Sequence, residues 1–75
     1  MRGIVTFVQP KKGYGFISIG DADYFFHVRA VVGGTPVFEA MEPGAVVMFE
    51  EDQFSKRGPR ARVVTVLHDA ERDER

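Results

Sequence analysis

In residues 11–17, with the sequence KKGYGFI, two lysines lead into an alternation of glycine and aromatic side chains with a period of two. This period is typical of a β-strand with one exposed face, because successive side chains of a strand point to opposite faces. Tyr14 and Phe16 are therefore predicted to share the solvent-facing side, while Gly15 and Ile17 face inward. Two lysines precede the aromatic residues, so the exposed face is predicted to combine aromatic rings with positive charge.

Turn sequences and β-branched residues predict four more strands along the chain. The five predicted strands span residues 3–9, 14–19, 23–28, 45–54 and 60–67. The first three are joined by short connections and are predicted to form an antiparallel meander, since a parallel pair needs a crossover of about a dozen residues. After the third strand, residues 30–32 are predicted to form a short helical turn, followed by a loop that carries Phe38.

Five short strands without a long amphipathic helix predict an all-β fold for these 75 residues. A closed or nearly closed barrel is favoured over an open sheet, because closure removes exposed strand edges. Val47 and Phe49 are predicted to face inward on the fourth strand. Because residues 50–52 are all acidic, the sequence leaves open which side chains of the rest of that strand face inward.

The composition limits the classes of function. The chain has no cysteine, and His27 and His68 lie far apart without ligand spacing, so neither a metal nor a cofactor is expected. No apolar run approaches the ~20 residues of a membrane span, and the chain begins as a strand rather than a signal peptide, which predicts a cytoplasmic protein. No nucleophile with its base and no phosphate-cradling loop is present in the sequence, so neither an enzyme nor a small-molecule substrate is expected.

The charges are unevenly distributed. Ten basic and eleven acidic residues give a net charge of −1, but four of the acids and two of the arginines fall in residues 68–75. Eight basic and seven acidic residues remain in residues 1–67, and the basic ones gather at residues 11–12 and 56–62. This pattern predicts one domain over residues 1–67, followed by a charged, disordered tail. Binding to anions is expected through local patches, with a modest salt dependence.

Three blocks of the sequence resemble the cold-shock domain family, whose members are small nucleic-acid-binding barrels of the OB-fold type. Residues 12–17 (KGYGFI) are similar to the family's first ribonucleoprotein motif, residues 23–28 (DYFFHV) to its second, and residues 57–61 (RGPRA) to its loop and last strand. The blocks occur in the family's order and spacing, over about residues 2–66. The resemblance implies a five-stranded antiparallel Greek-key β-barrel that binds single-stranded RNA or DNA. A monomer is expected, and a strand-exchanged dimer stays open.

The residues expected to bind nucleic acid are aromatic side chains on the exposed strand faces and the cations beside them. They are Phe7, Lys12, Tyr14, Phe16, Phe25, His27, Arg29, Phe38, Lys56, Arg57 and Arg60. The rings would stack on bases, since every base has a π-face, and the cations would contact phosphates. Two points stay open: Phe38 either joins this surface or plugs one end of the barrel, and the cations of residues 56–60 are equally compatible with ordinary solvated charge.

The chain departs from the family pattern at two places. Residues 6–9 are TFVQ where the family usually has lysine, tryptophan, phenylalanine and asparagine, and Val28 and Arg29 replace a phenylalanine and a serine. Each lost ring removes on the order of 1 kcal/mol of stacking. We therefore expect weaker binding than by a typical member, with Arg29 compensating through a phosphate contact or by stacking its guanidinium group.

The exposed rings impose conditions on two strands. Strict alternation places Val5 and Phe7 on one face, so burying the first while exposing the second requires a bulge or a strong twist. In the third strand, the same alternation exposes Phe25 and buries its two aromatic neighbours.

Two functions from different classes remain. The first is sequence-tolerant binding of single-stranded RNA or DNA, acting as an RNA chaperone or a regulator of transcription or translation, as the family resemblance implies. The second is a protein-interaction module on the same barrel with weakened nucleic-acid binding, which the acidic balance and the missing rings favour.

Overall fold

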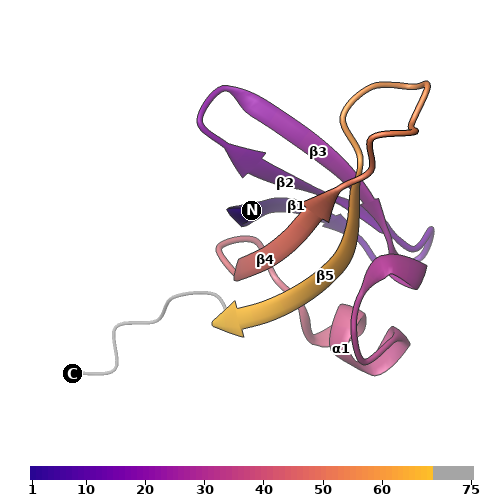
Figure 1. Ribbon diagram of the computed structural model, residues 1–75. Helices are drawn as coiled ribbons and strands as arrows, with labels where there is room; N and C mark the ends of the chain where they lie inside the picture. Colours follow the sequence, from indigo (N-terminus) through magenta and orange to yellow (C-terminus); the bar gives the residue numbers. More distant parts are fainter. Residues whose placement is uncertain (69–75) are drawn as a thin grey trace.

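The structure is a computed structural model that describes residues 1–68, which form five strands, a 3₁₀ turn and one short helix (Figure 1). The strands are β1 (Arg2–Gln9), β2 (Tyr14–Ile19), β3 (Ala22–His27), β4 (Val46–Glu51) and β5 (Ala61–His68). The 3₁₀ turn η1 (Val28–Ala30) and the helix α1 (Thr35–Ala40) lie between β3 and β4. The predicted tail therefore lies, apart from His68 at the end of β5, outside the described residues.

The strands form one antiparallel sheet in the order β3-β2-β1-β4-β5. The meander β1-β2-β3 is followed by a long connection that returns β4 to the free side of β1, which is the Greek-key arrangement. The sheet curls so that its two outer strands meet, and the backbone N–H of Phe25 on β3 donates to the carbonyl of Pro59, just before β5, at 3.1 Å. The structure confirms the predicted all-β, five-stranded antiparallel barrel.

The pairing of β1 with β2 contains the predicted irregularity. Val5 is opposite Ile17 and Phe7 is opposite Phe16, so the register shifts at Thr6. Because of this shift, Val5 is fully buried while Phe7 is 43% exposed. The bulge lets one strand supply both the core and the outer surface.

The inner face of the sheet forms a single apolar core. Alternation in β3 and β4 is as predicted, with Tyr24 and Phe26 buried on β3, and Val47 and Phe49 buried on β4. The largest fully buried side chains are Phe26, Phe38, Phe49, Ile17, Val5, Val47 and Val64. With the even-numbered aromatic residues of β3 in the core, Phe25 is left on the outer face.

The segment between β3 and β4 differs from the prediction. Residues 35–40 form the helix α1 instead of a loop, with Pro36 in its first turn, where a missing N–H costs no helical hydrogen bond. The predicted helical turn lies at Val28–Ala30 instead of residues 30–32. A six-residue helix is too short for its period to be recognised in the sequence, which explains the wrong prediction.

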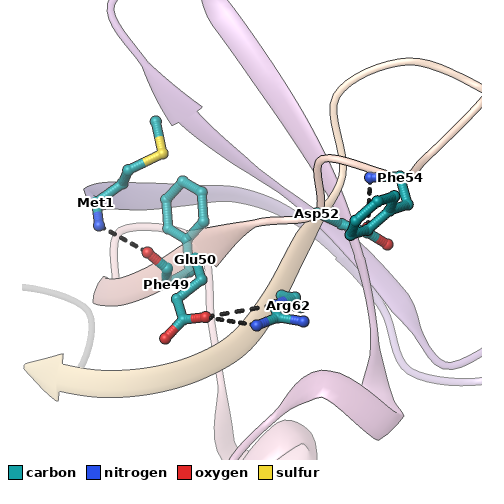
Figure 2. A network of polar contacts seen from close by, with 6 residues as sticks. All are labelled: Met1, Phe49, Glu50, Asp52, Phe54 and Arg62. Carbon is teal, nitrogen blue, oxygen red and sulfur yellow. Dashed lines mark hydrogen bonds and ion pairs between the residues drawn. The ribbon is translucent and has the colours of Figure 1, made fainter.

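The loop between β4 and β5 is longer than predicted, because β4 ends at Glu51 and not at residue 54. The Asp52 Oδ1 accepts a hydrogen bond from the backbone N–H of Phe54 at 3.0 Å, a turn typical of aspartate that ends the strand (Figure 2). The cationic residues Lys56 and Arg57 therefore lie on an exposed loop that precedes β5.

Candidate nucleic-acid interface

Four aromatic rings from β1, β2 and β3 gather on the outer face of the sheet. Phe7, Phe16 and Phe25 are cross-strand partners in one row, because the register pairs the first with the second and the second with the third. Their ring centroids are 6.3 Å and 5.8 Å apart along this row. Tyr14 lies 5.5 Å from Phe25, with only 20° between the ring planes. We call these four rings the ring surface.

Gly15 allows the ring surface to form. A Cβ atom at this position would lie 2.6 Å from the carbonyl oxygen of Phe7 and 2.8 Å from the ring of Phe26. Any side chain would therefore push β1 away from β2 or displace the core ring. The glycine between the two aromatic residues of β2 is thus required by close packing beneath the exposed rings.

His27 ends β3 and stands opposite Tyr14 in the β2–β3 pairing. Its Nδ1 accepts a hydrogen bond from the backbone N–H of Arg29 at 3.1 Å, which caps the 3₁₀ turn η1. In the neutral imidazole the proton must then be on Nε2, which remains available as a donor. His27 thus adds a hydrogen-bond donor at the edge of the ring surface.

Arg60 lies over the ring of Phe25, with its guanidinium carbon 5.1 Å from the ring centroid. This distance is within the range of a cation–π interaction. Beside it is a pocket of about 340 Å³, lined by Phe16 and Phe25 and by the end of the β4–β5 loop, including Arg57. The Ser55 hydroxyl donates to the carbonyl of Gly58 at 2.9 Å and holds this loop in a tight bend. Two cations and two rings therefore border one hollow.

The other predicted site residues are placed in three ways. Lys12 is exposed in the turn that leads into β2, and Arg29 is exposed on η1. Lys56 is exposed on the β4–β5 loop but does not line the hollow. Phe38 is 1% exposed on the inner side of α1, with its ring 6.1 Å from Phe26 in an edge-on contact. Its placement on the binding surface is corrected, because a ring without an exposed face cannot stack on a base.

The hollow also contains residues that the sequence analysis did not select. Asp23 lines it, as do Ser55, Gly58 and Pro59. Asp23 was recognisable in principle, because it shares the outward face of β3 with Phe25 at a spacing of two. The three loop residues depend on the fold of the loop, which no periodicity predicts.

A second, larger pocket of about 490 Å³ lies on another part of the surface. Figure 2 shows some of the residues that line it, among them Glu50, Phe54 and Arg62. We call it the acidic pocket, since Glu50 and Glu51 line it together with Phe54, which is 87% exposed. The α-amino group of Met1 donates to the carbonyl of Phe49 at 2.6 Å at its edge. Arg62 donates to the Glu50 carboxylate from Nη2 at 3.0 Å and from Nε at 3.3 Å.

The described part of the chain has neither a metal-binding cluster nor a membrane-spanning helix. Residues 1–68 contain no group of three or more histidine, aspartate or glutamate side chains placed to hold a metal ion. Among the same residues, no helix has the length and apolar character needed to cross a membrane.

Comparison with known proteins identifies the family of this chain. The sequence profile of the family described as the 'Cold-shock' DNA-binding domain matches residues 1–67. The chain is 42% identical to the cold shock protein CspB of Geobacillus stearothermophilus over 67 residues, which cover 88% of this chain and 97% of the relative. It is 40% identical to a cold shock-like protein of Thermotoga maritima over 68 residues, covering 89% and 98% of the two chains. A cold shock-like protein CspA of Vibrio cholerae is 38% identical over 69 residues, covering 89% and 94%. The chain belongs to the cold-shock domain family.

Proposed function

We propose that this protein binds single-stranded RNA or DNA, with little dependence on sequence, by stacking bases on the ring surface. The observation that carries the proposal is the row of Phe7, Phe16 and Phe25 across three strands of the outer sheet face. Stacking on an aromatic side chain contributes about 1–3 kcal/mol per base and tolerates any base. Membership of a family described as DNA-binding supports nucleic acid as the ligand.

Cations around the rings are suited to hold the backbone of the strand. Lys12 lies in the turn before β2, Arg57 and Arg60 border the hollow next to Phe25, and Lys56 is exposed on the β4–β5 loop. Each phosphate contact to a single strand adds about 0.7 to the slope of log affinity against log salt concentration. A few contacts of this kind predict a modest slope, in keeping with a net charge of −1.

Binding of this kind would act on RNA structure without a chemical step. A protein that binds only unpaired bases shifts the folding equilibrium of RNA toward open forms, by mass action and without ATP. We therefore infer a role as an RNA chaperone, or as a regulator of transcription or translation, in the cytoplasm. Binding makes and breaks no covalent bond in the nucleic acid or in the protein, and no catalytic group takes part.

The test is a titration of labelled seven-base oligothymidine and oligouridine, with a duplex of the same length as a competitor. Phe25→Leu removes the π-face but keeps an apolar side chain, and should weaken binding about 5- to 150-fold. Phe54→Leu is the matched control, because its ring is exposed at the acidic pocket and not on the ring surface. Equal affinities of the two variants, or no binding by the wild-type protein at low salt, would contradict the proposal.

A protein-interaction module is the second candidate, and one observation favours it. The acidic pocket combines two carboxylates with the most exposed phenylalanine ring of the described residues. Glu50 is already paired with Arg62, so a partner would present apolar side chains to Phe54 and a cation to Glu51. Absence of oligonucleotide binding at both low and moderate salt would favour this function over the first.

A further inference from the structure

The segment from the end of β3 through η1 runs beside the start of β5, and three arginines line the pocket at this junction. Parallel bridges join Phe25 to Arg60 and Val31 to Val64, and Arg29 and Arg62 lie between these two bridges. The backbone N–H of Val32 also donates to the carbonyl of Val64 at 2.8 Å, which fixes the alignment. Around this junction is a pocket of about 350 Å³, which we call the arginine pocket. It is lined by His27, Arg29, Ala30, Asp52, Arg60, Ala61 and Arg62.

The charge in the arginine pocket is not balanced by the carboxylates around it. Asp52 is the single acidic residue that lines it, and its Oδ1 accepts from the backbone N–H of Phe54 (Figure 2). Within residues 1–68, no carboxylate forms an ion pair with Arg29 or Arg60. Arg62 pairs with Glu50, but both side chains are more than half exposed, so this pair is weak and readily exchanged for another anion.

The geometry favours a phosphate as the ligand. A guanidinium group presents parallel N–H donors in a planar fork that matches two oxygens of a phosphate. The pocket is also continuous with the ring surface, because His27 and Arg60 border both, and the guanidinium of Arg60 lies over Phe25. A strand with a base stacked on Phe25 would therefore have a neighbouring phosphate within reach of the arginines.

We propose that the arginine pocket binds one phosphate of the nucleic acid strand, next to the base on Phe25. This inference rests on the proposed function and assigns a second contact to the same strand. An internal phosphodiester and a terminal phosphate offer the same oxygen chemistry to the arginines. The experiment below separates these two sources.

The experiment neutralises one phosphate at a time in a seven-base oligothymidine, by placing a methylphosphonate at each linkage in turn. Neutralising one particular linkage should weaken binding to the wild-type protein about 3- to 10-fold at low salt, more than neutralising any other linkage. With Arg29→Gln or Arg62→Gln, neutralising the same linkage should cost less than it does in wild type, because one of the arginines that contact this phosphate is already missing. Each variant should also reduce the salt slope by about 0.7. Oligonucleotides with a 5′-phosphate, a 3′-phosphate or neither show whether a terminal phosphate takes the same place.

Arg2→Gln is the matched control, since it removes the same exposed charge from β1, away from the arginine pocket. It should leave the cost of neutralising each single linkage as in wild type. Arg29→Lys keeps the charge but loses the planar fork, and should lie between wild type and Arg29→Gln. Thermal unfolding of each variant establishes that it is folded.

The outcomes separate the two proposals. If neutralising each linkage weakened binding by the same factor in wild type and in Arg29→Gln, the arginine pocket would be overturned. A loss of affinity caused by Phe25→Leu would in that case still support stacking. An equal loss from Arg2→Gln and Arg29→Gln would also overturn it, since long-range charge alone would then explain the effect. Failure of the wild-type protein to bind any oligonucleotide would overturn both.

Discussion

The Nδ1 atom of His27 accepts a hydrogen bond from the backbone N–H of Arg29 at 3.1 Å. The last residue of β3 thereby caps the 3₁₀ turn that carries the arginine. The bond fixes the orientation of the imidazole ring beside Tyr14 and the direction in which the chain leaves the sheet. One short contact thus connects the ring surface to the arginine pocket.

Two substitutions at His27 should separate its capping from its ring. His27→Ala loses the cap and should lower the free energy of unfolding by about 0.5–1 kcal/mol, whereas His27→Asn can still accept from the Arg29 N–H and should stay close to wild type. Both lose the imidazole, so both should bind oligothymidine more weakly than wild type. His27→Ala should bind more weakly than His27→Asn, because the 3₁₀ turn that carries Arg29 also frays. Urea unfolding and oligonucleotide titration measure the two effects.

The wild-type protein provides the control for this prediction. Nitrogen-15 NMR of the imidazole should show the neutral tautomer with its proton on Nε2. A neutral ring protonated on Nδ1, or equal stabilities of His27→Ala, His27→Asn and wild type, would show that the cap does not form in solution.

Gly15→Ala should damage both stability and binding. Its Cβ would meet the carbonyl oxygen of Phe7 at 2.6 Å, and because this atom belongs to the backbone it cannot rotate away. Overpacking of this kind costs about 1–3 kcal/mol, and the forced movement of Phe7 should weaken oligonucleotide binding. Urea unfolding and titration against labelled oligothymidine would measure the two losses.

Gly20→Ala is the comparison for this change. Nothing lies within 4 Å of its added methyl group, but its φ of 57° gives a conformational cost of about 1–2 kcal/mol. This variant should lose stability while keeping its affinity for oligonucleotides. A Gly15→Ala protein with wild-type affinity would show that the close approach of β1 and β2 does not support the ring surface.

The faces of the strands could be predicted because each face follows from local alternation. In β2 and β3, a spacing of two between aromatic residues indicates which rings are exposed, and Phe16 and Phe25 lie as expected. Even the bulge in β1 was predictable, since Val5 and Phe7 could not otherwise lie on opposite sides. These predictions needed only the geometry of a strand.

Features that depend on contacts between distant segments could not be predicted in the same way. Phe38 is buried because α1 places it against Phe26, and no pattern in residues 33–40 indicates that contact. The arginine pocket joins residues near position 29 to residues near position 61, which meet only when the barrel closes. Closure itself was expected, but the residues that it brings together depend on the register of the closing strands.

Val63 is the one non-glycine residue of the described chain with a positive φ, 52°. It lies in a bulge where Val63 and Val64 together oppose Phe49, since Met48 pairs with Thr65 and Glu50 with Arg62. A β-branched residue in this conformation carries about 1–2 kcal/mol of strain. Asparagine tolerates the left-handed region, so Val63→Asn should raise the free energy of unfolding by about 0.5–1 kcal/mol in urea unfolding.

The control for this substitution lies on the same strand. Thr65 is exposed without a positive φ, and Thr65→Asn should slightly lower the stability, because asparagine is a poor strand former. If both asparagine variants were destabilised alike, the strain assigned to Val63 would be absent.

Phe38→Leu and Phe25→Leu should give opposite results, because one ring is buried and the other borders the solvent-facing hollow. Phe38 is 1% exposed, so a smaller side chain leaves a gap in the core and should cost about 1–2 kcal/mol of unfolding free energy. The affinity of the folded Phe38→Leu protein for oligothymidine should equal that of wild type, since this ring faces Phe26 and not the ligand. Phe25→Leu should instead lose affinity with a smaller loss of stability.

The two variants are compared by urea unfolding and by oligothymidine titration under conditions where each variant is folded. A Phe38→Leu protein of normal stability and reduced affinity would mean that α1 releases this ring to stack on a base, and the core position would then be only the unbound state.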